Sequence, residues 1–167
     1  ILVSQKQYLN ALKVYKSLPQ DRLINFAEQQ YSAGNDEIAL LAFQYLEEVI
    51  SDSFIKNSYR LREAFIHYRN GRYLSTKDTL NQILADSLMT ERPYLYRQGA
   101  NMNARKLMAE TSLALEHNPQ TAEYWYKEAK KFCANAYEIQ NIDLALARLK
   151  LTQEDYQSAS TILNSIQ

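Results

Sequence analysis

Hydrophobic residues recur along most of the chain at intervals of three and four, and short polar stretches interrupt this pattern. Such intervals place the hydrophobic residues on one face of an α-helix, so the pattern predicts amphipathic helices joined by tight turns. Two of the turns, "AGND" (Ala33 to Asp36) and "NGRY" (Asn70 to Tyr73), contain a glycine, which suits the positive φ that often follows a helix. Two successive helices and the turn between them are therefore predicted to form an antiparallel hairpin.

The predicted hairpins repeat with a period of 37 residues. One unit aligns with the next at this shift, which superimposes Gly34 on Gly71 and Tyr31 on Tyr68. The opening stretch of residues 1–19 aligns with the end of the chain at a shift of 148, which is four periods. Small residues recur 12 or 13 positions apart and would let the helices of a hairpin approach closely: Ala27 and Ala39, Ala64 and Thr76, Ala109 and Ala122, Ala147 and Ala159.

One hairpin cannot bury its apolar faces alone, so successive hairpins are expected to stack. The sequence thus predicts an all-α fold of about nine helices, forming about four and a half antiparallel hairpins in a right-handed superhelix, an α-solenoid. We expect a single domain over residues 1–167, with hairpins at residues 1–18 (the second half of a unit), 20–51, 54–86, 94–132 and 135–167. Because the chain begins within an apolar run, we interpret it as a fragment of a longer helical array.

Polar and aromatic residues add detail to the predicted hairpins. Asn35, followed by Asp36 and Glu37, and Asn118, followed by Pro119, are expected to cap the second helices of two hairpins. Aromatic residues are expected to fill the space beside the small residues: Phe43, Tyr45, Tyr73, Trp125, Tyr126 and Tyr156. Repeat packing is therefore the favoured interpretation of the 13 tyrosines, and a ligand-stacking groove is the alternative.

Composition narrows the classes of fold and function. Three glycines and three prolines in 167 residues are too few for the many turns of a β-sandwich or an α/β fold. The formal net charge is zero, so nucleic acid is not favoured as a direct partner. No apolar run is long enough to predict a membrane span, and the single Cys133 excludes an internal disulfide. The compartment stays open between the cytoplasm, which we favour slightly, and the periplasm or cell envelope.

The repeat resembles the tetratricopeptide-repeat superfamily. The resemblance covers roughly residues 5–167 and is carried by the small residues of each hairpin, the turns "AGND" and "NGRY", and "QEDYQSA" (Gln153 to Ala159). It implies a superhelix whose first helices line a concave groove that holds a protein or peptide segment. The long period and the stretch "LALARLKLTQEDYQSASTIL" also resemble the sensor domains of large LuxR-type transcription activators and the helical arms of secretion and envelope-assembly proteins.

Candidate catalytic residues are few. His67, His117 and Cys133 are the only residues that could form a Cys–His pair, and no nucleophile motif, HExxH, CxxC or glycine-rich phosphate loop accompanies them. A buried structural cysteine is the favoured interpretation of Cys133. We therefore expect no enzymatic activity, no cofactor and no metal.

Charge is unevenly distributed along the chain. The formal charge is −3 over residues 1–55, +6 over residues 56–106 and −3 over residues 107–167. Within the basic block, Arg62 and Arg69 are seven positions apart and share a helix face, with Tyr68 beside them. An acidic peptide or protein surface is a fitting partner. The alternative is a solvated face whose arginines pair with neighbouring repeats.

We therefore predict a non-catalytic interaction module that holds a protein or peptide segment, preferably an acidic one, in a concave groove. The alternative is a regulatory or sensor domain of a larger signalling protein or transcription activator, next to flanking domains. Glu28 argues against capture of a terminal carboxylate. On this view Arg62→Glu with Arg69→Glu would abolish binding and leave melting nearly unchanged. The expected contact residues are Glu28, Tyr31, Arg62, Tyr68, Arg69, Lys106 and Arg148.

Overall fold

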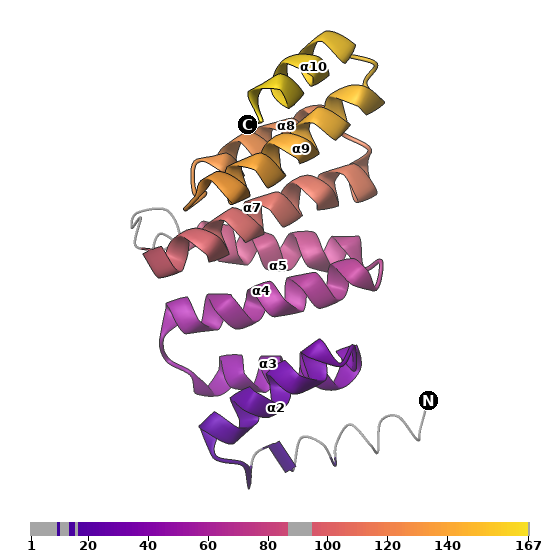
Figure 1. Ribbon diagram of the computed structural model, residues 1–167. Helices are drawn as coiled ribbons and strands as arrows, with labels where there is room; N and C mark the ends of the chain where they lie inside the picture. The colour runs from indigo at the N-terminus through magenta and orange to yellow at the C-terminus, as the bar shows by residue number, and fades with distance from the viewer. Residues whose placement is uncertain (1–9, 11–13, 16, 87–94, 167) are drawn as a thin grey trace. The chain divides into compact units, whose positions relative to one another are not determined.

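The structure is a computed structural model that describes residues 10, 14–15, 17–86 and 95–166 (Figure 1). The described residues form α-helices and connecting turns, without a strand, so the predicted all-α fold class is confirmed. Most of the half hairpin predicted at residues 1–18 lies outside the described residues. None of the described helices is long and apolar enough to cross a bilayer.

Contacts within the chain divide it into two compact units, Ile1–Arg72 and Tyr73–Gln167. In the first unit, α2 packs against α3 and α3 against α4. In the second unit, α5 packs against α7, and α7, α8, α9 and α10 pack successively against one another. The helices of the first unit are α2 (Gln20–Ser32), α3 (Asp36–Val49) and α4 (Ser53–Arg69). Those of the second are α5 (Tyr73–Ala85), α7 (Leu95–Glu116), α8 (Pro119–Lys130), α9 (Ala136–Thr152) and α10 (Tyr156–Ser165).

Three predicted hairpins coincide with pairs of helices that pack together. They are α2 with α3, α7 with α8, and α9 with α10. The helices predicted within residues 54–86 are α4 and α5, and the division between the two units falls at the turn that joins them. The periodicity of hydrophobic residues therefore located the helices closely.

A residue with positive φ lies in each of four helix–helix turns. Gly34 (φ +76°) and Gly71 (φ +70°) occupy this conformation as predicted. His117 (φ +49°) and Glu154 (φ +60°) occupy it in the third and fourth turns, where the sequence has no glycine. Thirty-seven positions separate the first two of these residues, and the same number separates the last two. The backbone thus repeats the period of the sequence within each of these two pairs, although 46 positions separate Gly71 from His117. Two turns place an ordinary side chain where glycine is less strained.

Replacing Glu154 by glycine is expected to raise the free energy of unfolding by about 0.5–1 kcal/mol, because the left-handed conformation is strained for a residue with a Cβ. Gly34→Ala is the reciprocal change and should lower it by a similar amount. A Cβ at Gly34 would meet no atom within 4 Å, so only the backbone conformation would be penalised. Urea unfolding followed by circular dichroism measures both changes, and a loss of stability in Glu154→Gly would contradict the expectation.

Helix capping follows the prediction at one position and departs from it at another. Asn118 accepts a hydrogen bond from the backbone N–H of Thr121 at 2.9 Å, and Pro119 occupies the first turn of α8, as predicted. Asn35 is the N-cap residue of α3, as predicted, but its side chain makes no capping hydrogen bond. Its Nδ2 instead donates to Gln30 Oε1 at 2.8 Å, because the turn brings Asn35 back to the end of α2.

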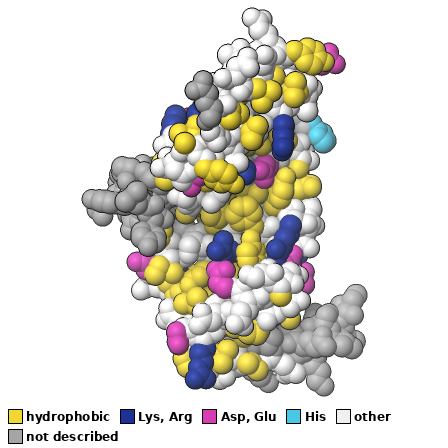
Figure 2. Space-filling model, in the orientation of Figure 1, with side chains coloured by type: hydrophobic (Ala, Val, Ile, Leu, Met, Phe, Trp, Pro, Cys, Tyr) yellow, Lys and Arg dark blue, Asp and Glu magenta, His cyan; other side chains and the backbone are white. Residues whose placement is uncertain are grey.

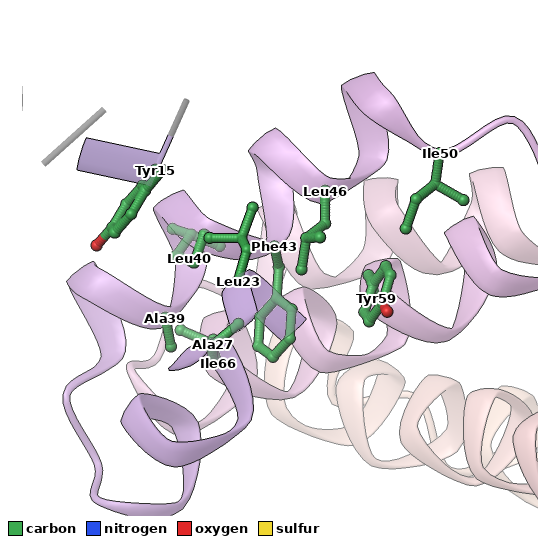
Figure 3. Packing of buried hydrophobic residues seen from close by; sticks show 11 residues of the cluster. Tyr15, Leu23, Ala27, Ala39, Leu40, Phe43, Leu46, Ile50, Tyr59 and Ile66 are labelled. Carbon is green, nitrogen blue, oxygen red and sulfur yellow. The ribbon is translucent and has the colours of Figure 1, made fainter. Parts of the chain in front are cut away.

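The core of the first unit is built around Phe43, which points into a cluster of buried side chains from α2, α3 and α4 (Figure 3). Its ring is fully buried and stacks on Tyr59, with ring centroids 5.7 Å apart and an interplanar angle of 21°. Tyr31 meets Phe43 edge to face, with centroids 6.1 Å apart. Ala27 and Ala39 are fully buried in the same cluster, as expected of small residues that let helices approach closely.

The second unit has its own core, formed by α7, α8, α9 and α10. Its buried residues are Met102, Ala109, Ala122, Tyr126, Ala129, Ile142, Leu146 and Leu149. The partly buried Trp125, Phe132 and Cys133 pack against this cluster. Tyr156, predicted to fill space beside the small residues, is 66% exposed, so that prediction is wrong. It is the first residue of α10, where a side chain can project away from the packed face.

Candidate functional site

A pocket of about 340 Å³ lies in the second unit and is the candidate functional site. Residues of α7, α8 and α9 line it. Its size is at the lower end of the range typical of ligand sites, about 300–1,000 Å³. Lys106, Glu110 and Leu113 come from α7, Tyr126 comes from α8, and Asn141, Leu144, Ala145, Arg148, Leu149 and Thr152 come from α9.

The apolar part of the pocket wall is continuous with the core of the second unit. Tyr126 and Leu149 are buried members of that core, and Leu113 and Ala145 are partly buried against it. Because the core fixes these side chains, this part of the wall is preformed. Inserting an apolar group here would remove hydrophobic surface from water on both partners at little cost in protein ordering.

The polar part of the pocket wall carries positive charge. Arg148 is exposed and forms no ion pair with any other described residue. Lys106 Nζ lies 4.0 Å from Glu110 Oε1, one turn away on α7, at the limit of an ion pair. Burial raises the pKa of Glu110, although the charge of Lys106 opposes the shift, so burial disfavours the negative charge of Glu110. Figure 2 shows hydrophobic and charged side chains next to one another over α7 and α9.

Two of the seven predicted contact residues, Lys106 and Arg148, meet at this pocket. The other five belong to the first unit. Sequence reasoning missed the apolar lining residues and Asn141, although a signal for them existed. Lys106, Glu110 and Leu113 are four and three positions apart on α7, and Asn141, Ala145 and Arg148 are four and three positions apart on α9. This is the spacing of residues on one helix face.

The predicted basic face of α4 forms ion pairs with acidic residues of its own unit. Arg62 Nε lies 3.2 Å from Glu28 Oε1, and Arg69 Nε donates to Asp36 Oδ2 at 2.8 Å. Two further arginines form equivalent pairs: Arg60 with Glu47 at 2.8 Å and Arg72 with Glu37 at 2.9 Å. These contacts favour the alternative interpretation of the basic block, in which its arginines pair with neighbouring repeats.

Tyr31 is covered by the same arginines. The Arg69 guanidinium carbon lies 4.7 Å from the centroid of the Tyr31 ring, and that of Arg62 lies 5.2 Å from it. Both distances are within the range of cation–π attraction. Arg69 Nη2 also donates to the backbone oxygen of Tyr31 at 3.3 Å. Tyr68, the equivalent residue one period later, is half-buried at the end of α4. The ring of Tyr31 is thus engaged by its own chain.

Arg62→Glu combined with Arg69→Glu is now expected to lower the free energy of unfolding by about 2 kcal/mol. The change removes two partly exposed ion pairs and two cation–π contacts and places new carboxylates beside Glu28 and Asp36. Circular dichroism should show retained helicity and a lower melting temperature, and added salt should reduce the difference.

Arg22→Glu is the matched control for this double change. Arg22 is exposed, lies in the first turn of α2 and forms no ion pair within the described part of the chain, so a glutamate is tolerated there. If the double variant melts like the wild type, as the sequence alone led us to expect, the observed pairs contribute nothing to stability.

A carboxyl group is buried between α3 and α4. Glu63 is 6% exposed, and its Oε1 has no hydrogen-bond partner among the described residues. The pKa of Glu63 is raised to about 9, chiefly by burial and further by the hydrogen bond and charge of Glu47. A hydrogen bond from Gln44 and the charge of Arg60 oppose this shift. Burial and the neighbouring Glu47 therefore favour the protonated form of Glu63 in the folded chain.

The candidate catalytic residues are Cys133, His67 and His117. Cys133 is half-buried, and its Sγ donates to the backbone oxygen of Ala129 at 3.8 Å. Burial raises the pKa of Cys133, the charges of Glu138 and Asp143 raise it further, and only Lys130 opposes them. The reactive thiolate is therefore disfavoured. His117 belongs to the same unit and His67 to the other, and the described residues contain no cluster of three metal-ligating side chains.

Comparisons with models of protein families, with curated proteins and with solved structures find no match to this chain. The resemblance to tetratricopeptide repeats therefore depends on the sequence pattern quoted above. Function has to be inferred from the chemistry of the pocket.

Proposed function

We propose that the chain is a tetratricopeptide-like, non-catalytic interaction module that binds a peptide segment of another protein at the pocket of the second unit. The observation that carries this proposal is the combination of a fixed apolar wall with the exposed Arg148, which forms no ion pair within the described part of the chain. A segment with an apolar side chain and a neighbouring carboxylate satisfies both parts of the wall. We further propose that the hairpins stack as a superhelical solenoid whose first helices, including α7 and α9, line a concave face.

The pocket chemistry supports a protein or peptide partner more than nucleic acid. Arg148 and Lys106 are the two cations of the lining, and Glu110 lies between Lys106 and the apolar wall along α7. A nucleic-acid site would need a longer row of cations to follow successive phosphates. The arginines of α4 belong to the other unit and pair with carboxylates there.

A displayed library of random 16-residue peptides tests the proposal. Enriched peptides should bind the wild-type chain and lose at least tenfold in affinity with Arg148→Glu or Leu144→Asp, measured by calorimetry. Arg22→Glu should leave their affinity unchanged, because Arg22 is an exposed arginine of the other unit. If no enriched peptide depends on the pocket residues, the proposed function is wrong.

A further inference from the structure

Exposed apolar side chains form a stripe along α9. Tyr137, Leu144 and Leu151 are 73%, 39% and 46% exposed, and each is seven positions from the next. Seven residues make nearly two turns, so the three side chains leave α9 on almost the same side, about 10.5 Å apart along its axis. The α9 stripe, as we call these three residues, passes the pocket at Leu144, which belongs to both.

The spacing of the α9 stripe suits a helix better than an extended peptide. A second helix lying along α9 repeats its contacts every three or four residues and every seven, at the same rise per residue. An extended strand places side chains on one side about every 6.6 Å, so it can meet Tyr137 and Leu151, about 21 Å apart, but it has no side chain on that side opposite Leu144, about 10.5 Å from each. A helical ligand can therefore contact all three members, whereas an extended one cannot do so in register.

The pocket beside Leu144 provides an anchor point for such a helix. Its volume of about 340 Å³ is enough for one or two large side chains, and its apolar wall includes Leu113, Tyr126 and Leu149. Recognition of amphipathic helices typically uses anchors one or two turns apart that enter a hydrophobic groove. The flanking stripe residues Tyr137 and Leu151 would contact the turns before and after the anchor.

The positions of two cationic side chains in the site predict where the ligand carries its carboxylates. Arg148 lies between Leu144 and Leu151 on α9, four positions from the first and three from the second. Lys106 lies on α7 in the same pocket lining, and among the described residues its ion pair is the distant one with Glu110. Both cations therefore flank the place where the anchor would enter, and a ligand with carboxylates next to its anchor would pair with them.

We propose that the ligand of this site is an amphipathic helix that lies along α9, inserts an apolar anchor into the pocket and pairs aspartate or glutamate residues with Arg148 and Lys106. This inference rests on the proposed function and specifies the conformation and charge of its ligand. A second copy of the chain and an extended peptide are the alternatives that the experiment has to separate.

Two displayed libraries of 18-residue peptides provide the test. Both randomise the same positions, one within an alanine-rich helical frame and the other with a central proline that breaks a helix. On the wild-type chain, the helical library should yield binders with apolar residues three, four and seven apart and with aspartate or glutamate beside them. Arg148→Glu should weaken these binders at least tenfold, and peptides with lysine in place of the acidic residues should regain affinity for that variant.

The outcomes separate this inference from the proposed function. Pocket-dependent binders found only in the proline library would overturn the helical ligand and leave the proposed function intact. Helical binders whose affinity is unchanged by Arg148→Glu would overturn the requirement for acidic residues in the ligand. No pocket-dependent binder in either library would contradict both proposals. Sedimentation should show a monomer at micromolar concentration, and a dimer that Leu144→Asp dissociates would make a second copy the occupant and overturn the inference.

Discussion

Replacing Glu63 by glutamine is expected to raise the free energy of unfolding by about 2 kcal/mol at pH 8. Glutamine has nearly the same shape, stays neutral and can still donate a hydrogen bond to Glu47. In the wild type, a carboxyl group that would be ionised in the unfolded chain must hold a proton in the folded one, because it is buried between α3 and α4. The substitution removes this requirement.

The effect depends on pH in a defined direction. The pKa of Glu63 is about 9 in the folded chain and near the ordinary value of 4.5 in the unfolded chain. The folded chain therefore binds the proton more tightly, and the Glu63 contribution to stability is fully present below about pH 4.5. It is lost progressively as the pH rises to about 9 and is constant above that. Glu63→Gln should lack this decline.

Urea unfolding at pH 5, 7 and 9, followed by circular dichroism, measures the difference. Glu48→Gln is the matched control, because Glu48 is exposed on the same helix as Glu47 and should behave like the wild type at every pH. If Glu63→Gln is less stable than the wild type at pH 8, or declines with pH as steeply, Glu63 is ionised in the folded chain and our interpretation is wrong.

Phe43→Ala should lower the free energy of unfolding by about 3–5 kcal/mol, the largest loss that we expect from a single substitution. The ring is fully buried, stacks on Tyr59 and receives the edge of Tyr31, so its removal leaves a cavity in the core of the first unit. Figure 3 shows it surrounded by Leu23, Ala27 and Leu46. These side chains come from packed helices and cannot collapse fully into the space.

Chemical denaturation measures the loss, and two further variants calibrate it. Phe43→Leu keeps much of the volume and should lose less than half as much. Val49→Ala changes an exposed side chain of the same helix and should stay within about 0.5 kcal/mol of the wild type. A loss below about 1 kcal/mol in Phe43→Ala would show that the aromatic cluster is not the centre of this core.

Helix positions and turns could be predicted from the sequence because both depend on local pattern. The intervals between hydrophobic residues located α2, α3 and α4, and Gly34 and Gly71 identified two turns from the conformational freedom of glycine. The positive φ of His117 and Glu154 was not predicted, because neither residue is a glycine. Extending the period of 37 from Gly71 points to residue 108 and not to His117, whereas Asn118, predicted as a helix cap, marked the third turn one position later.

The contacts between hairpins could not be predicted from the sequence pattern. Arg62 and Arg69 were recognised as sharing a face, but their partners Glu28 and Asp36 lie more than 30 positions earlier. Which carboxylate meets which arginine depends on how far one helix is displaced along the next. For the same reason Lys106 and Arg148 were chosen by their place on first helices, while the wall that makes a pocket beside them was missed.

Trp125 gives the chain a built-in optical reporter. It is the single tryptophan of the sequence, it packs partly buried against the core of the second unit, and it adjoins Tyr126 of the pocket wall. The Tyr124 ring meets it edge to face, with ring centroids 5.1 Å apart. Indole emission shifts with the polarity around the ring, so a ligand that displaces water from the pocket is expected to change the fluorescence of the unlabelled chain. Occupancy could then be followed without modifying either partner.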